Sequence, residues 1–250
     1  MPTPRDQGSP LPKGEPTFDT TRWSVVLLAG RAPNSQSAAA LQTLCQTYWY
    51  PLYAYVRRRA TDVSQAQDLT QAFFAELVEK NFVGIATPER GRFRAFLLTA
   101  LKHFLSKQWE RANAQKRGGG RAPLSLDFQN ADSRYASEPA LDLTPEQIYD
   151  RNWAVTLLAE VMQRLEKEFN EYGQAEQFRL IKGFAIGDHA GTTYAEVAAA
   201  LRTTEAAAKM AAHRMRQRYR QLLRDEIAQT VATPAEVDDE IRSLFNVLKS

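Results

Sequence analysis

Two stretches of the chain are rich in basic residues whose side chains could neutralise the phosphates of a nucleic acid. Residues 89–121 contain nine basic and two acidic residues, and residues 202–224 contain seven basic residues and one acidic residue. Between and after them, residues 127–150 hold six acids and one base, and residues 225–250 hold six acids and two bases. Lys and Arg that neutralise phosphates release counterions and so supply affinity for a polyanion. The alternation predicts two contacts with one polyanion, divided by an acidic segment that stays off it.

The second basic stretch has the outline of a helix-turn-helix. A first short helix is predicted from four apolar residues at helical spacing, Tyr194, Val197, Ala198 and Leu201. Residues 202–204 are the predicted turn, and Thr204 is a suitable N-cap for a second helix with a basic outer side. Such a pair places its second helix in the major groove of DNA. The alternative is an ordinary helical hairpin with a solvated basic face.

The first basic stretch combines positive charge with aromatic rings. A single-stranded DNA site needs cations that follow the phosphates and rings that stack on the bases. Most rings of this stretch share its apolar stripe, so Phe96 and Phe104 are expected in the core. Phe93 and Trp109 lie nearer the ends and could instead face DNA. This helix is therefore a second candidate for nucleic-acid contact.

No set of residues points to catalysis. The three histidines, His103, His189 and His213, are scattered and have no second ligand at metal-binding spacing. The glycines at 118–120 follow a helical pattern and lack the Lys-Ser/Thr of a phosphate-binding loop. The single Cys45 cannot form an intramolecular disulfide and is expected to be a small buried residue. We predict a protein that is not an enzyme and that uses no cofactor and no metal.

Helical periodicity and helix-stop signals predict an all-α protein. Helices are expected over residues 21–30, 35–60, 62–81, 90–116, 145–172, 174–184, the helix-turn-helix and 234–248. Pro51 predicts a kink or a break in the second of these helices. Thr144, Pro145 and Gln147 together are a helix-start signal. No stretch of the sequence reads convincingly as a strand.

We expect two small helical domains joined by an acidic flexible linker, the second domain containing the helix-turn-helix. The predicted segments are a disordered lead over 1–19, a first helical domain over 20–120, the linker over 121–143, the second domain over 144–225 and a C-terminal helical extension over 226–250. Apolar linker residues such as Phe128 could dock locally. The apolar face of the extension could pack on the second domain, which we favour, or recruit a partner. No apolar run approaches the roughly 20 residues that span a bilayer, and the N-terminus lacks the apolar segment of a secretory signal. A cytoplasmic location without a membrane partner is therefore expected.

Four stretches, taken together and in order, resemble the extracytoplasmic-function (ECF) group of sigma-70-type RNA polymerase sigma factors. Residues 48–59 resemble region 2.1 of that family, and residues 66–77 resemble region 2.2, whose usual form is an Asp-Leu-x-Gln-Glu-x-Phe helix. Residues 90–117 resemble regions 2.3 and 2.4, and residues 194–223 resemble region 4.2. The resemblance implies a cytoplasmic sigma factor that binds core RNA polymerase and directs promoter recognition and DNA melting at transcription initiation.

The resemblance also implies a role for individual residues. Polymerase binding would fall on Asp68, Leu69, Gln71 and Phe74. DNA contact on the minus-10 side would fall on Arg90, Arg92, Lys102, Lys107, Trp109, Arg111, Lys116 and Arg117. DNA contact on the minus-35 side would fall on Thr204, Lys209, His213, Arg214 and Arg216. Core RNA polymerase and promoter DNA are thus the expected partners, and an anti-sigma factor or other regulatory protein is a further one that the family allows.

The chain departs from the family pattern at several positions. Ala72 stands where region 2.2 usually has Glu, and Met210 and Ala211 stand where region 4.2 commonly has Ser or Thr and Arg. The alanine-rich helix after Thr204 leaves few side chains for reading bases, which favours contact with phosphates over sequence specification. Two other functions fit the same composition. One is a helix-turn-helix regulator that does not bind polymerase, and the other is a helical adaptor that binds only proteins.

Overall fold

The computed structural model describes residues 22–31, 34–87, 91–114, 126–137, 143–187, 191–228, 230–231 and 233–249, and within them it contains helices and no strand. This confirms the all-α prediction. The predicted lead over residues 1–19 and the glycines at 118–120 lie outside the described residues. None of the described helices has the length and apolar character that crossing a bilayer would require.

The described residues of the first half form α-helices and a short 3-10 helix. They are α1 (Arg22–Ala29), α2 (Ser35–Arg59), α3 (Val63–Glu79), η1 (Phe82–Ile85) and α4 (Phe93–Ala114). Side chains cap two of them, because Asn34 accepts from the backbone N–H of Ser37 and Asp62 accepts from that of Gln65. Each cap satisfies a backbone donor that the first turn of a helix leaves without a partner.

Helix α2 continues through Pro51, so the predicted break is not found. Proline removes one backbone hydrogen bond and would weaken an exposed helix at this point. Here the surrounding residues are buried on several sides, with Tyr50 4% exposed and Leu52 and Tyr53 fully buried. Tertiary packing around the proline offsets the lost hydrogen bond and keeps the helix continuous.

The end of α1 meets η1 backbone to backbone. A Cβ added at Gly30 would lie 2.6 Å from the Cα of Gly84, which is closer than side chains tolerate. Asn81 adopts a left-handed conformation (φ 48°) and donates from its side-chain amide to the Gly30 carbonyl at 3.0 Å. The two glycines therefore let α1 close one end of the first half.

The described residues of the second half form α-helices and a short 3-10 helix. They are α5 (Phe128–Ser137), α6 (Pro145–Glu171), α7 (Ala175–Ile186), α8 (Tyr194–Ala200), α9 (Glu205–Ala228), η3 (Pro234–Glu236) and α10 (Val237–Lys249). The predicted start of α6 is confirmed, because Thr144 and Gln147 form a reciprocal capping box. Helices α7, α8 and α10 begin and end within three residues of the predicted bounds.

Helix α5 was not predicted and lies inside the segment predicted as a flexible linker. It docks on α2 through Phe128, whose ring meets Trp49 edge-on at 5.9 Å and Tyr53 at 5.6 Å. The carboxylate of Asp132 on α5 accepts from the Tyr53 hydroxyl and from Gln67 of α3. The prediction that apolar linker residues dock locally is confirmed at Phe128, whereas the prediction of a wholly flexible segment is wrong for residues 128–137.

The helix-turn-helix is formed by α8 and α9. Thr193 caps α8 through a capping box with Glu196, and Thr204 accepts from the Ala207 N–H at the start of α9. At the turn, Arg202 is left-handed (φ 52°) and the Thr203 N–H donates to the Ala198 carbonyl, which satisfies the end of α8. Small buried residues line the contact between the helices. They are Ala198, Ala208, Ala211 and Ala212.

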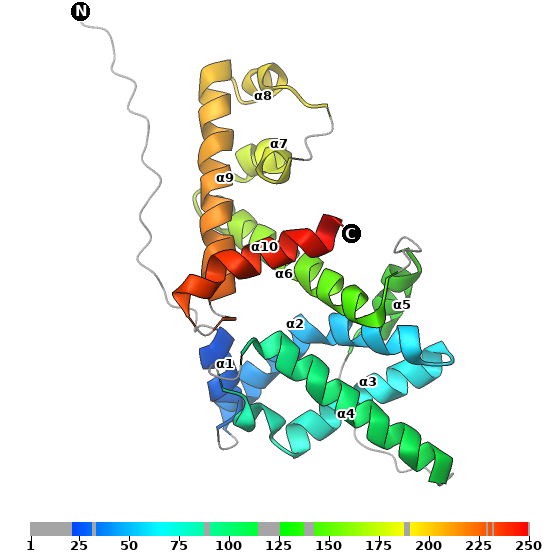
Figure 1. Cartoon of the computed structure of the whole chain (residues 1–250). Helices are drawn as coiled ribbons and strands as arrows, with labels where there is room; N and C mark the ends of the chain where they lie inside the picture. The colour runs from blue at the N-terminus through cyan, green and yellow to red at the C-terminus, as the bar shows by residue number, and fades with distance from the viewer. Residues whose placement is uncertain are drawn as a thin grey trace, which may run out of the picture.

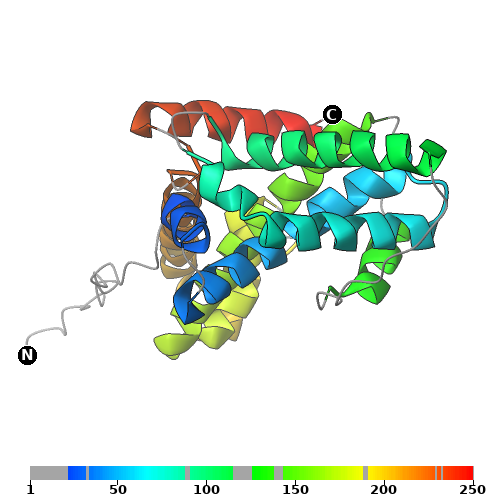
Figure 2. The ribbon, with the colours of Figure 1, turned by 90° about the horizontal axis from the view of Figure 1, so that it is seen from below.

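The two halves of the chain share one continuous apolar core. In Figure 1, α9 stands upright with α7 and α8 beside it, and α6 runs diagonally to the layer of α2, α3 and α4. Helix α6 packs against both α2 and α9, while α10 crosses the lower end of α9 and packs on α6. Seen from below, α10 and α4 lie along the same edge of the molecule (Figure 2). Packing of the extension on the second half, as predicted, is confirmed, and it is joined by a contact with α4.

Candidate nucleic-acid interface

The first half of α9 presents a basic, solvent-exposed face. Its inner side is buried through Ala208, Ala211 and Met215, which fixes the opposite side towards solvent. Exposed residues at helical spacing form this outer face, which we call the α9 face and define as Lys209, Met210, His213, Arg214 and Gln217. These exposed side chains follow one side of the helix.

Two predicted residues near the start of α9 have structural partners. Thr204 is exposed and caps α9, as described above. Lys209 forms an ion pair with Glu205 one turn earlier, at 2.7 Å, and the hydrogen bond to Glu205 raises the Lys209 pKa. Both groups are about half exposed, so the pair is a surface contact of small energetic weight. Lys209 can exchange this partner for a phosphate at little cost.

Arg216 does not share the α9 face. Its guanidinium donates to the backbone carbonyl of Phe184 at the end of α7, with N–O distances of 3.0 and 3.2 Å. Cations are favourable at helix C-termini because the last carbonyls lack intrahelical partners. Arg216 therefore joins α7 to α9 and holds the hairpin in place.

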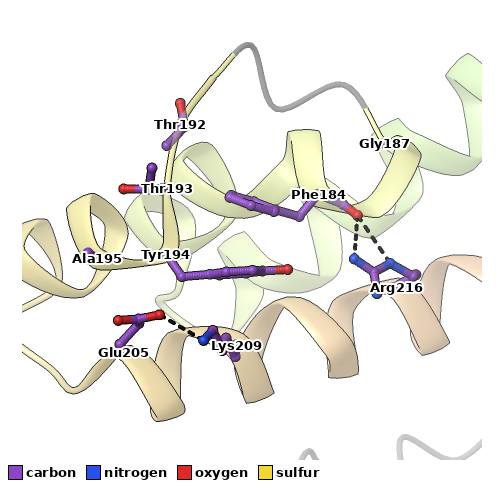
Figure 3. A pocket seen from close by; sticks show the side chains of 9 residues that line it. All are labelled: Phe184, Gly187, Thr192, Thr193, Tyr194, Ala195, Glu205, Lys209 and Arg216. Carbon is purple, nitrogen blue, oxygen red and sulfur yellow. Dashed lines mark hydrogen bonds and ion pairs between the residues drawn. The ribbon is translucent and has the colours of Figure 1, made fainter.

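A cavity of about 410 Å³ lies where α7 ends and α8 and α9 begin (Figure 3). Tyr194 stacks on Phe184 with ring centroids 4.5 Å apart, and the Lys209 ammonium lies 5.8 Å from the Tyr194 ring centroid. Figure 3 shows the Glu205–Lys209 pair below these rings and the Arg216 contact beside them. The charged groups that line the cavity therefore already have partners, Lys209 and Glu205 each other on α9 and Arg216 the Phe184 carbonyl on α7. Nowhere in the described part of the chain do three or more His, Cys, Asp or Glu residues gather as metal ligands would.

Of the eight predicted minus-10 residues, Lys102, Lys107, Trp109 and Arg111 lie on α4, and those whose side chains the structure describes do not form one exposed face. Lys107 is exposed, and Trp109 is half-buried with the Arg59 guanidinium 4.9 Å from its ring centroid. Lys102 is paired with Glu146 of α6 at 2.8 Å, and Arg92 is paired with Glu240 of α10 at 2.7 Å. The remaining predicted residues cannot be placed. Arg90, Lys116 and Arg117 lie outside the described residues, as does the side chain of Arg111.

The aromatic residues of α4 contribute to the apolar core. Phe104 is buried, as expected, and Phe96 is half-buried against Phe93. Of the two rings that could instead have faced DNA, Phe93 is 2% exposed and meets Tyr48 edge-on at 5.4 Å, so it belongs to the core. Helices α6 and α10 cover the first turn of α4. The sequence of α4 alone does not reveal this cover.

The family model described as ECF sigma factor matches residues 34–225. The chain belongs to the ECF sigma factor family. A search of curated proteins and a search of solved structures found no match to it. The matched residues of this sigma factor run from the N-cap of α2 into α9, so α10 lies beyond the matched region.

Helix α3 of the sigma factor carries the residues predicted to bind polymerase. Asp68 is exposed, and Leu69 and Gln71 are half-buried on the outer side of the helix. Phe74 is 1% exposed and packs edge-on against Phe73 at 5.7 Å, so it belongs to the core beneath that surface. Three of the four predicted residues are thus accessible to a partner.

Sequence reasoning counted Arg94 among the bases of the sigma factor and missed its special position. Its guanidinium binds Glu240 at 2.8 Å and also Asp150, and it lies 4.6 Å from the ring centroid of Trp153. The Tyr149 hydroxyl donates to the Arg94 carbonyl at 2.9 Å. Arg94 precedes Leu97 and Leu101 by three and seven residues, so a base on the apolar stripe was the available signal.

The electrostatics of this cluster follow from its burial. Burial alone would lower the Arg94 pKa, but the hydrogen bond and charge of Glu240, together with the charge of Asp150, outweigh it and raise that pKa. Burial also raises the Asp150 pKa, against the opposing effect of Arg94 and with the nearby charge of Glu240 adding to the rise. The cluster therefore depends on keeping both acids and Arg94 together, because none of them is solvated well enough alone.

Proposed function

We propose that this sigma factor binds core RNA polymerase and directs the holoenzyme to promoters, where it contacts duplex DNA through α9 and melted DNA through α4. The observation that carries the proposal is the family match over residues 34–225, which spans both basic helices and α3. The alternative, a helix-turn-helix regulator that never binds polymerase, shares the α9 face but needs no interface on α3.

The duplex contact is assigned to the α9 face. His213 and Arg214 are exposed one turn from Lys209, and all three lie away from the buried side of the helix. The neighbouring exposed Met210 and the buried Ala211 leave few groups able to read bases. Positioning on phosphates is accordingly the main contribution of this helix.

The contact with melted DNA is assigned to Arg92 and α4, and the exposed part of this surface lies towards the C-terminal end of α4. Lys107 is exposed there, and Trp109 offers a half-buried ring beside the Arg59 guanidinium. A ring flanked by cations is suited to an unstacked base, since the cations bind the adjoining phosphates. Arg111, Lys116 and Arg117 continue this basic stretch in the sequence.

The polymerase contact is assigned to the outer side of α3, with Asp68 as its exposed charge and Leu69 and Gln71 beside it. Charged residues at the rim of an interface steer association, and half-buried apolar residues supply contact area. Phe74 supports this surface from within the core. The family also allows a regulatory protein such as an anti-sigma factor as a further partner of the same surfaces.

The decisive experiment mixes the purified full chain with core RNA polymerase and a library of genomic fragments. We expect a stable complex on size-exclusion chromatography and transcripts whose 5′ ends map to a common upstream sequence. Asp68→Ala should reduce the affinity for core polymerase while leaving the circular dichroism spectrum unchanged. Glu166→Ala is the matched control, because Glu166 is an exposed acid on α6, away from α3.

Binding of duplex DNA without any association with core polymerase would point to the regulator instead. Loss of all DNA binding at low salt would leave only a protein-binding helical adaptor.

A further inference from the structure

The first turn of α4 is held by a carboxylate from the end of the chain. Glu240 of α10 is fully buried, and its two oxygens accept from Arg92 at 2.7 Å and from Arg94 at 2.8 Å. Helix α10 lies beyond the part of the chain that matches the family, so this contact is an addition to the common fold. Figure 2 shows α10 along the same edge of the molecule as α4.

Two acids of α6 extend the same arrangement. Asp150 binds Arg94, and Glu146 binds Lys102 two turns further along α4, at 2.8 Å. Three cations of the first basic stretch thus pair with acids that come later in the chain. Carboxylates and phosphates compete for the same N–H donors, because both present paired anionic oxygens to a guanidinium.

We propose that α10 is an intramolecular latch, in which Glu240 takes the place of DNA phosphate on Arg92 and Arg94 and keeps the chain in a closed form. In the closed form, Arg92 and Lys102 have carboxylate partners and cannot release counterions from DNA. The part of this inference that concerns DNA rests on the proposed function, whereas the closure itself rests on the contacts alone.

The chemistry of the contact suits a latch. A buried ion pair gains little over the hydrated ions when both partners return to water together, so its separation is far less costly than the loss of one partner alone. The apolar residues Val237 and Leu244 anchor α10 on α6 and α9 and keep the free chain closed. Opening then requires a competing anion or partner, and the affinity for DNA falls by the fraction of molecules that are open.

The test compares the full-length wild type with Glu240→Gln and with Asp239→Asn as the matched control. Asp239 is the exposed neighbour of Glu240 and pairs with Arg242 on its own helix, so its loss leaves the latch intact. The probes are a fluorescein-labelled single-stranded oligonucleotide and a duplex, each of about 30 nucleotides or base pairs, titrated by anisotropy at several salt concentrations. Hydrogen exchange of the α10 and early α4 amides reports opening without DNA.

We expect Glu240→Gln to bind the single strand about tenfold more tightly, because more molecules are open. Its slope of log affinity against log salt should steepen by about 0.7 for each cation that newly contacts a phosphate. Hydrogen exchange of α10 should accelerate, while Asp239→Asn should match the wild type in every measurement.

A second variant, Glu146→Gln, changes a pair that is partly exposed on both sides. This substitution should therefore not unfold the chain. It should tighten single-strand binding by about twofold to threefold, since it frees one cation without breaking the buried cluster. If Glu240→Gln fails to fold, Leu244→Ala, which loosens the anchor of α10 while keeping Glu240, decides the question with the same exchange and slope measurements.

Two outcomes would overturn the latch. One is unchanged affinity and salt slope in both variants although the wild type forms a holoenzyme, in which case the proposed function stands and only the latch falls. The other is unchanged exchange of α10 in Glu240→Gln. Absence of both DNA and polymerase binding in all variants would instead reject the proposed function, and the masking role with it.

Discussion

Helices α4 and α9 have similar basic composition but offer their charges to solvent very differently. In the first half of α9, His213 and Arg214 are exposed, and Lys209 pairs only with its own neighbour Glu205. In the first half of α4, acids from α6 and α10 bind Arg92, Arg94 and Lys102, as described above. The number of basic residues therefore gives the charge of a segment but not how many of its cations are available to bind a polyanion. Acids distant in sequence decide which of the cations are already neutralised.

The same division occurs within α9 itself. Towards its C-terminal end, Arg218 makes a paired contact with Glu168 of α6 at 2.7 Å, and Arg224 pairs with Asp238 of α10 at 2.5 Å. The bases near the helix-turn-helix turn stay open to solvent, whereas those near α6 and α10 are occupied. Position relative to the acidic helices, more than position in the basic stretch, separates the two groups.

The largest effect in this comparison is expected at Arg94. Arg94→Ala leaves Glu240 buried without its bidentate partner and should lower the free energy of unfolding by about 3–5 kcal/mol. Urea unfolding followed by circular dichroism measures it. Arg220→Ala on the exposed side of α9 is the control and should change stability by about 0.5 kcal/mol or less. Equal losses in the two variants would remove the distinction between the helices.

A smaller loss of stability is expected when Arg216 is replaced. This variant distinguishes a cation of α9 with a structural role from the exposed cations of the same helix. Arg216→Ala removes two hydrogen bonds to the Phe184 carbonyl and should cost about 1.5–3 kcal/mol, the range for hydrogen bonds to charged groups. Thermal or urea unfolding gives the value. A variant that keeps full stability but loses duplex binding would place Arg216 on the DNA instead.

Arg214 is expected to show the opposite behaviour. Arg214→Ala should leave stability unchanged, weaken duplex binding at low salt and reduce the salt slope by about 1, because one phosphate contact is lost. Anisotropy titrations with the wild type at three or more salt concentrations provide the comparison. An unchanged slope with weakened binding would assign Arg214 to a base edge.

The smallest effect concerns the Glu146–Lys102 pair that links α4 to α6. The hydrogen bond from Lys102 lowers the Glu146 pKa below its usual value of 4.5, so the stabilisation is present above about pH 4.5 and is lost as the pH falls through the lowered pKa. Both groups are well exposed, so the contribution is about 0.5 kcal/mol or less.

Wild type and Glu146→Gln should therefore differ by a constant small amount from pH 7 to pH 5 and converge at lower pH. Urea unfolding at a series of pH values measures the difference. A gap that widens on acidification would contradict the assigned direction.

Local sequence signals were sufficient for most helices. The Thr144–Gln147 pair predicts the start of α6, and the apolar spacing from Tyr194 predicts α8. Both signals are local, because a cap or an amphipathic face depends only on residues a few positions apart. Helix α5 escaped prediction because its support comes from Trp49 and Tyr53 on α2. A short polar segment of that kind is stabilised by what it docks on more than by its own propensity.

The candidate site divides in the same way. The exposed positions of Arg214 and His213 follow from the helical period of α9, since the buried alanines and Met215 fix its inner side. The burial of Phe93 agrees with its helical spacing to Phe96 and Leu97. The burial of Phe74 could not be read from its spacing alone, because it depends on the layer that covers its helix.

By itself, the sequence determined an all-helical chain, the order of its segments, its membership of the ECF sigma factor family and the location of its two basic stretches. These properties depend on helical period, capping residues and local charge, which act over a few residues. Only the tertiary structure decided which of the bases are available. The pairing of Glu240 with Arg92 and Arg94 joins residues about 150 positions apart, and its energy depends on a burial that no local pattern encodes.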